Sequence, residues 1–323
     1  MNVIRSSARV PAGSLFLGLA LFGAQPALAQ DYPAKTVRVV TAEVGSGSEV
    51  VARIVAQALS THYGQPFVID GRTGGVIAGE VVSKSPPDGY TLLFYGNTLW
   101  TTPLLRKQVP YNIARDFAPI TMAVQSTLVL VVHPSLQVNS TRDLIALAKA
   151  KPGQLDYSVA AVGSGNFMAA ELFLYLSGVK MTRIGHKGFP SALLSTVTGQ
   201  APIFFPTIGA GMAQVQAGKL KGIAVTSAKP SALAPGLPTI AETLPGYESV
   251  FSSAAFAPTG TSAALITRLN RDIIQMLQRD DVKQKLLAIG MEPVGSSPQE
   301  VDAAIKAEMA IMGKVIAKAG IQE

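Results

Sequence analysis

A Gly-rich turn with the sequence Gly45-Ser46-Gly47-Ser48 follows the apolar-rich run 37–40 and precedes a helical pattern. Glycine permits positive φ and lets backbone N–H groups point into open space at a helix start, where the helix dipole favours negative charge. Ser46 and Ser48 add hydroxyl donors. The turn therefore predicts capture of a small anion, with an ordinary tight turn as the equal alternative. It lacks the third glycine of a dinucleotide-binding loop, and no Gly-Lys-Ser/Thr follows it as in a Walker loop.

A second turn of this kind, Gly163-Ser164-Gly165-Asn166, lies between a strand pattern and a helix pattern in "YSVAAVGSGNFMAAELF". A third strand end, in "FYGNTLW", carries Asn97 and Thr98, which can both donate hydrogen bonds. Ligands of open α/β sheets bind beyond the carboxyl ends of the strands. The turns in the two halves of the chain therefore predict the two lips of one cleft.

Residues for catalysis or metal binding are hard to find. No Gly-x-Ser-x-Gly elbow occurs, and the absence of cysteine excludes thiolate nucleophiles, thiolate metal sites and disulfides. His62, His133 and His186 are far apart and lack metal-ligand spacing, and Glu43 and Glu49 form no obvious acid/base pair. We expect His62 and His133 to be structural and Glu49 to lie in the first turn of a helix. His186, in "IGHKGFP", is equally compatible with a cleft position and with a structural role.

These residues need elements to position them, and strand and helix patterns alternate along almost the whole chain. The expected strands are 37–41, 67–70, 91–95, 128–133, 155–159, 181–184, 202–205, 222–226 and 249–257. The expected helices are 49–60, 77–85, 141–151, 166–176, 192–198, 211–217, 262–279, 281–289 and 299–318. Such alternation predicts an α/β protein with mainly parallel sheets, and two series of this length fit two domains.

The N-terminal segment has the pattern of an export signal. Arg5 and Arg9 give a positive start, residues 14–23 form a short apolar core, and Ala27-Leu28-Ala29 has small residues where a signal peptidase reads. The apolar core is well short of the roughly 20 residues that span a bilayer. Neither a twin arginine nor a cysteine for lipid attachment is present. We therefore expect cleavage by a Sec-type pathway after Ala29 and a protein free in the periplasm.

The composition of the chain limits the classes of binding partner that we expect. The hydrophobic fraction of 48% is typical of a globular chain. The formal charge of +7 falls to +5 once Arg5 and Arg9 leave, and the basic residues are scattered, with only 7% aromatics. This pattern argues against a nucleic-acid groove, and it suits small anions or an ordinary solubilising surface equally well.

The chain resembles the Bug (TctC-like) family, the extracytoplasmic solute receptors of tripartite tricarboxylate transporters, over essentially its whole mature length. The resemblance is carried by "YPAKTVRVV", "EVVARIVAQALSTHYGQPFVID", "SPPDGYTLLFYGN", "VPYNIARDFAPIT", "LVLVVHPS", "LIALAKAKPGQLDYS", "AAELF", "HKGFPSAL", "VQAGKLKGIAVTSAKPSALAPGLPTIAE" and "FAPTGTSAALITRLN".

This resemblance implies a type II periplasmic-binding-protein fold, with two α/β domains, crossover strands and a ligand cleft between them. After the signal peptide 1–29, the first domain would comprise 30–133 plus 248–323, and the second 134–247. A small carboxylate would be held by amides, hydroxyls and waters. The residues expected to bind it are Gly45, Ser46, Gly47, Ser48, Asn97, Thr98, Gly163, Ser164, Gly165, Asn166, His186, Lys187, Gly188 and Thr207.

Two departures from the family pattern bear on the ligand. The family's first loop usually reads Pro-Pro-Gly-Gly with an Asp three residues later, whereas this chain has Glu43-Val44-Gly45-Ser46 and then Glu49. An Asp-Asn pair is common after the strand "IFF", where this chain has Pro206-Thr207. A buried ammonium needs an acidic partner, so we expect unaminated mono- or dicarboxylates to be preferred over amino acids.

A monomeric receptor without cofactor or metal, delivering its ligand to membrane permease subunits, is thus the main prediction. Hinges near 133–135 and 247–253 would allow the domains to close on the ligand. One alternative is a periplasmic enzyme acting on a small organic acid, for which only His186 and Lys187 are candidates. Another is a ligand-binding sensor subunit for a membrane kinase.

Overall fold

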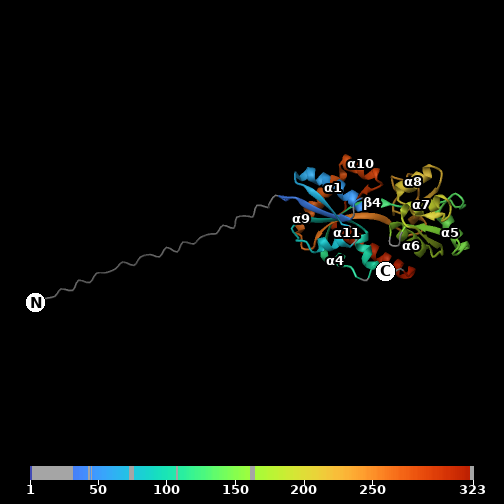
Figure 1. The fold of residues 1–323 in the computed structure, drawn as a ribbon, viewed down its shortest axis with the longest axis horizontal. Helices are drawn as coiled ribbons and strands as arrows, with labels where there is room; N and C mark the ends of the chain where they lie inside the picture. The colour runs from blue at the N-terminus through green and yellow to red at the C-terminus, as the bar shows by residue number, and fades with distance from the viewer. Residues whose placement is uncertain are drawn as a thin grey trace.

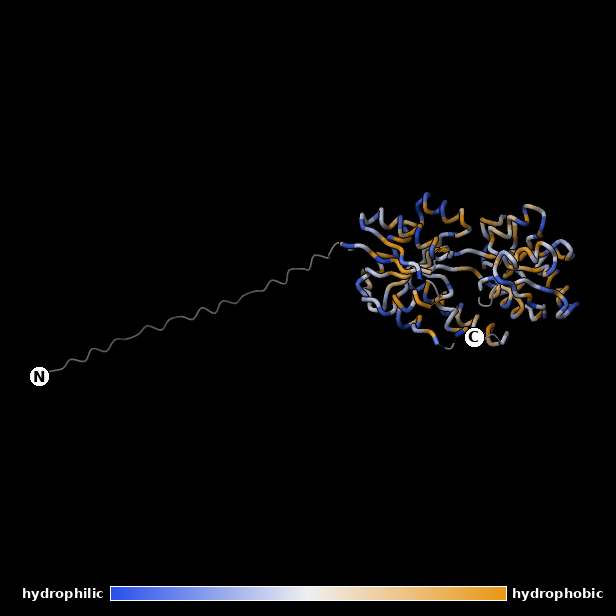
Figure 2. The backbone as a smooth tube through the Cα atoms, in the orientation of Figure 1, coloured by the Kyte–Doolittle hydropathy of each residue, from blue (hydrophilic) through white to orange (hydrophobic). Residues whose placement is uncertain are grey.

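The computed structural model describes Met1 and residues 32–42, 44, 46–72, 76–106, 108–160 and 164–320. Apart from Met1, the predicted signal peptide lies outside these residues, as do Glu43, Gly45 and Gly163. Figure 1 shows two α/β bodies side by side, joined by long strands that include β4 (Phe117–Thr127) and β10 (Val250–Pro258). Hydrophobic residues run through the strands inside each body (Figure 2). Within the described ranges, no helix has both the length and the apolar character needed to cross a bilayer.

The first sheet, with the helices packed on it, is called lobe 1. Its strand order is β11-β4-β10-β3-β1-β2. The remaining strands are β1 (Val37–Ala42), β2 (Phe67–Arg72), β3 (Thr91–Gly96) and β11 (Glu292–Pro293). β1 pairs in parallel with β2 and β3, whereas β10 runs antiparallel to β3 and β4.

Alternation along the strands of lobe 1 fills two hydrophobic layers. Val39 and Phe94 face one layer, and Val40 and Leu93 face the other, which also contains Trp100. The helices of this lobe are α1 (Gly47–Tyr63), α2 (Ile77–Ser83), α3 (Thr98–Leu105), α4 (Ile113–Asp116), α9 (Ala263–Gln278), α10 (Asp280–Ala288) and α11 (Pro298–Ala319). Successive side chains of a strand point to opposite faces, so helices must cover both faces of such a sheet.

The second sheet and its helices form lobe 2. Its strand order is β7 (Thr182–Gly185), β6 (Asp156–Val159), β8 (Ile203–Phe204), β5 (Val129–Val132) and β9 (Lys221–Val225). The helices are α5 (Thr141–Ala150), α6 (Gly165–Ser177), α7 (Phe189–Val197) and α8 (Ile208–Gln216), with a 3₁₀ turn at Ile240–Glu242. β6 is parallel to β7 and β8, and β5 is antiparallel to β8 and β9.

The α/β prediction is confirmed, but the expectation of mainly parallel sheets is wrong. Both sheets are mixed, because the chain enters lobe 2 through β4 and β5 and returns through β10, and these strands pair antiparallel with their neighbours. The passage between the sheets lies between β4 and β5, near Leu128, and so precedes the expected boundary after His133.

Every predicted helix and strand has a counterpart, whereas β4, β11, α3, α4 and the 3₁₀ turn were not predicted. β4 contains Pro119, which pairs with Phe256 at an irregularity of the ladder with β10. Proline is found in sheets at bulges and edges, so a strand that contains one is hard to predict from the sequence. α3 likewise contains Pro103.

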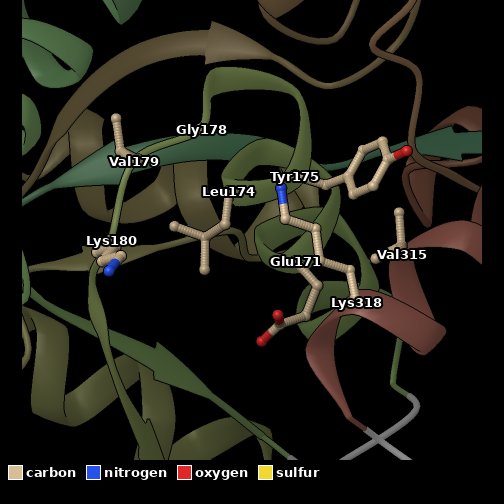
Figure 3. A pocket seen from close by; sticks show the side chains of 8 residues that line it. All are labelled: Glu171, Leu174, Tyr175, Gly178, Val179, Lys180, Val315 and Lys318. Atoms are coloured by element: carbon tan, nitrogen blue, oxygen red, sulfur yellow. The ribbon is translucent and has the colours of Figure 1, made fainter.

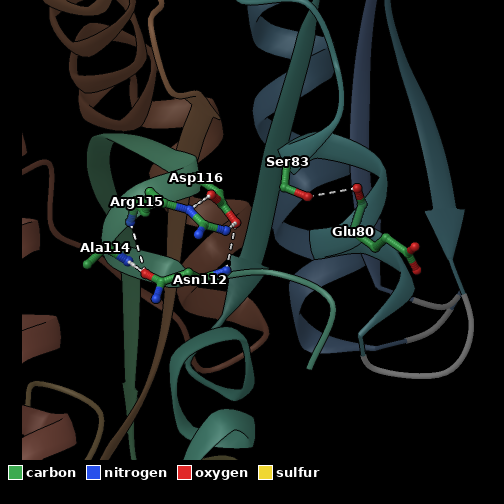
Figure 4. A network of polar contacts seen from close by, with 6 residues as sticks. All are labelled: Glu80, Ser83, Asn112, Ala114, Arg115 and Asp116. Carbon is green, nitrogen blue, oxygen red and sulfur yellow. Dashed lines mark hydrogen bonds and ion pairs between the residues drawn. The ribbon is translucent and has the colours of Figure 1, made fainter. Parts of the chain in front are cut away.

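The short helix α4 shows how local polar residues define an element (Figure 4). The Asn112 Oδ1 accepts hydrogen bonds from the N–H groups of Ala114 at 3.0 Å and Arg115 at 3.1 Å. The Asp116 carboxylate accepts from the Asn112 N–H at 2.7 Å and the Arg115 Nε at 2.6 Å. These bonds satisfy the free N–H groups at the helix start and direct the chain into β4.

Helix α11 packs on both lobes. Val301 and Ile305, near its start, belong to a hydrophobic layer of lobe 1. Met312, Val315 and Ile316 belong to the main core of lobe 2. The C-terminal helix therefore ties the lobes together in addition to the crossover strands.

Candidate functional site

The predicted turns all follow the carboxyl ends of parallel strands. In lobe 1, β1 precedes α1 and β3 precedes α3; in lobe 2, β6 precedes α6 and β7 precedes α7. Because parallel strands end at the same edge of a sheet, each lobe gathers its turns along one edge.

The start of α1 packs against the end of β3. Ser46 is the N-cap of α1, and its Oγ accepts the Glu49 N–H at 3.2 Å. Ser48 is buried, and a Cβ on Gly96 would lie 2.9 Å from its Oγ and equally close to the Phe251 ring. A side chain at position 96 would displace Ser48 or Phe251, so glycine lets the first turn of α1 approach the end of β3 closely.

Phe251, on β10, was not among the predicted site residues. Its ring lies close to both Gly47 and Gly96, because a Cβ on Gly47 would lie 3.4 Å from Cζ and a Cβ on Gly96 would lie 2.9 Å from Cε2. The ring is half-buried and gives this edge an apolar wall. Its contacts are long-range, so only the folded chain reveals them.

Acidic groups near this edge already have partners. Glu49 is buried in the first turn of α1, as predicted, and accepts a hydrogen bond from the Arg53 Nε at 2.8 Å. Its backbone N–H and its carboxylate therefore both make hydrogen bonds within α1 and its N-cap.

Two buried hydroxyls at the same edge have no hydrogen-bond partner among the described residues. Thr41 is near the end of β1, and Ser253 pairs with Gly96 in the ladder between β10 and β3. Both side chains are fully buried. An unpaired buried hydroxyl costs about 1–3 kcal/mol. This edge of lobe 1 therefore has two hydroxyl groups whose hydrogen-bonding capacity the described residues do not use.

The side chain of Asn97 is directed into the protein. One amide hydrogen bonds the Val250 carbonyl at 3.1 Å and the other the Glu308 Oε1 at 3.1 Å. The backbone N–H of Asn97 donates to the Ser252 carbonyl at 2.9 Å. Asn97 thus anchors the start of α3 to β10 and α11.

Thr98, the first residue of α3, lies across from lobe 2. A small cavity of about 30 Å³ at this position has walls from both lobes. It is lined by Asn97, Thr98, Thr101, Gly165, Met168, Ser249, Val250, Glu308 and Met312. The structure therefore brings three predicted residues, Asn97, Thr98 and Gly165, together from the two halves of the chain.

The turn before α6 is braced internally. Ser164 is the N-cap residue in an extended conformation, and its Oγ donates to the Asn166 Oδ1 at 2.9 Å. The same oxygen of Asn166, which is buried, accepts the Ala160 N–H at 3.0 Å. The side-chain oxygen of Asn166 therefore links Ala160, after β6, to Ser164 at the start of α6.

The remaining predicted residues lie at other helix starts of lobe 2. His186 is half-buried, with its Nε2 3.3 Å from the Oγ of buried Ser158. Lys187 is exposed, and Gly188 is the extended N-cap of α7. Thr207 is an exposed N-cap of α8 that bridges to Leu128. The hydrogen bonds of His186 hold it to lobe 2.

Within the described part of the chain, no three histidine or acidic side chains come together as a metal site would require. A separate pocket of about 290 Å³ lies between α6 and α11 (Figure 3). Glu171 lines it, accepting the Tyr157 hydroxyl at 2.6 Å, and Lys318 lies over the Tyr175 ring at 4.9 Å. None of the predicted site residues lines this pocket.

Comparison with known proteins agrees with this geometry. The family model described as tripartite tricarboxylate transporter family receptor (TctC) matches residues 51–321. Protein BugT of Bordetella pertussis is 32% identical over 308 residues, covering 92% of this chain and 93% of the relative.

Solved structures give the same result. R. palustris Rpa4515 with adipate has a TM-score of 0.72 and 36% identity, covering 90% of this chain and 99% of that chain. A TctC solute-binding protein from Polaromonas, at 21% identity, has a TM-score of 0.82 over 89% of this chain and 99% of that chain, a likeness of fold. The resemblance seen in the sequence is confirmed, and the chain belongs to the receptor family of tripartite tricarboxylate transporters.

Proposed function

We propose that this solute receptor binds a small unaminated carboxylate between its lobes, at the edge formed by the starts of α1, α3 and α6. The observation that carries the proposal is the juxtaposition of Thr98 and Gly165, one residue from each lobe, which line the same water-sized gap between the lobes. Backbone amides at helix starts bind carboxylates well when they are held in place. The 36% identical Rpa4515 structure contains adipate, which supports this ligand class.

Preference against an ammonium group follows from the acids near the site. Glu49 is paired with Arg53, and Glu308 accepts hydrogen bonds from Trp100 and Asn97. An incoming ammonium would have to displace these partners, and the unaminated ligand would not.

Calorimetry on matched pairs tests this preference. We expect succinate to bind at least about tenfold more tightly than aspartate, equal to about 1.4 kcal/mol, and adipate likewise more tightly than 2-aminoadipate. Preference for the amino acid in both pairs would contradict the proposal and point to Glu43, Glu49 or Glu308 as the ammonium partner.

The remaining proposals concern the fate of the ligand, the partners of the receptor and its export. The family and its structural relatives are solute receptors, and we propose that this chain returns its ligand chemically unchanged and acts as a monomer with membrane permease subunits. We also propose export to the periplasm with cleavage after Ala29; the intact mass of the exported protein checks that position.

A further inference from the structure

Glu308 of α11 lies where three elements meet. Its Oε2 accepts the Trp100 Nε1–H at 2.7 Å, and its Oε1 accepts the Asn97 amide at 3.1 Å. Since Asn97 also donates to the Val250 carbonyl, the start of α3 is tied to α11 and β10 at once.

The position of Glu308 connects the candidate ligand edge with the crossover strands. On one side it lines the cavity that contains Thr98 and Gly165. On the other side it lines a groove of about 320 Å³ along β4 and β10, with Gln125, Glu248 and Ser252. One helical turn later, Met312 packs in the core of lobe 2. A movement of α11 at Glu308 would therefore shift side chains that pack in both lobes.

The carboxylate is held by few partners. Among the described residues that line the cavity and the groove, Glu248 alone carries a charge besides Glu308. Burial raises the pKa of Glu308, its two donors oppose this shift, and the charge of Glu248 adds to it. The donors Trp100 and Asn97 are thus the groups that favour the ionised form.

We propose that Glu308 is a positioning residue for ligand binding: its two carboxylate oxygens hold Asn97 and Trp100 and thereby fix the first turn of α3, where Thr98 faces lobe 2. This inference rests on the ligand site proposed above. The ionised carboxylate accepts both bonds, whereas a glutamine replaces one acceptor oxygen by an NH₂ donor and protonation turns one oxygen into a hydroxyl that is a weaker acceptor. One bond is then lost or weakened, the binding-competent arrangement is less populated, and the apparent affinity falls by that fraction.

Trp100 is the only tryptophan of the chain, so its fluorescence reports on this contact without any ligand. We expect the emission of the ligand-free wild-type protein to change between about pH 4 and about pH 8, with a midpoint above the ordinary range of glutamate. Glu308→Gln is expected to remove this transition. An identical titration in wild type and Glu308→Gln, or no transition in wild type, would overturn the assignment.

Calorimetry with adipate tests the effect on binding. At neutral pH, Glu308→Gln is expected to weaken adipate binding about tenfold, while its melting temperature stays equal to or above that of wild type, because burial disfavours the charge it removes. Glu248→Gln, which neutralises the other acid of the groove, is the matched control and is expected to bind as wild type does. Unchanged affinity in Glu308→Gln, or equal losses of affinity and stability, would show that Glu308 does not position the site.

A second variant covers the case in which Glu308→Gln does not fold. Trp100→Phe keeps an aromatic ring and removes one donor, and a several-fold weakening of adipate binding at unchanged pH is expected. A wild-type chain that binds no carboxylate overturns the proposed function and the ligand part of this inference, whereas the fluorescence titration decides the Glu308 contact by itself.

Discussion

At the scale of single residues, one buried carboxylate of lobe 1 is held by specific partners. Asp272 on α9 is almost fully buried, and its carboxylate accepts hydrogen bonds from the Arg271 Nε at 2.8 Å and from the Tyr63 hydroxyl. Burial alone would raise the pKa of Asp272, but these donors outweigh burial and lower it. The carboxylate therefore fastens α1 to α9 in its ionised form.

Replacing this carboxylate tests its contribution to stability. A lowered folded-state pKa stabilises the protein above the unfolded pKa of about 3.9, and this contribution is lost as pH falls through the folded pKa. Asp272→Asn is expected to cost about 2 kcal/mol at neutral pH and progressively less below about pH 4. Urea unfolding across pH measures both, with exposed Asp281→Asn as control. A cost independent of pH would contradict this account.

At the scale of elements, α11 connects the two lobes, because its first half packs on lobe 1 and its second half on lobe 2. Met312 is buried in the core of lobe 2, whereas Lys314, on the same turn, is exposed. Met312→Ala is expected to cost about 2–4 kcal/mol and Lys314→Ala less than about 0.5 kcal/mol in denaturant unfolding. Equal stability of the two variants would mean that α11 does not hold lobe 2.

At the scale of the whole molecule, contacts between the lobes bear on closure. The chain passes between sheets at Leu128 and again at Ser249, whose N–H donates to the Thr226 carbonyl at 3.0 Å. Across the lobes, the Ser231 Oγ donates to the Glu292 Oε1 at 2.7 Å. Two lobes joined by narrow strands favour hinge motion, and we place the hinges at these passages.

Ligand binding is therefore expected to draw the lobes together. The radius of gyration measured by small-angle scattering should decrease with saturating adipate, and the neutral analogue 1,6-hexanediol should leave it unchanged. An equal radius with and without bound adipate would indicate that the lobes are already closed or that they do not move.

By itself the sequence determined much of the local structure and the family. Hydrophobic periodicity and the positions of glycine at turns depend only on neighbouring residues. For this reason every strand and helix predicted from them has a counterpart in the structure, and so do the starts of α1 and α6. Tertiary structure alone decided the mixed sheets, the strand β4 with its Pro119, and the placement of α11 across both lobes. It also decided the partners of the predicted site residues. Asn97 was expected to bind a ligand, and that remains a prediction; its hydrogen bonds to Val250 and Glu308 could not be predicted, because residues more than a hundred positions away reach it only in the folded chain.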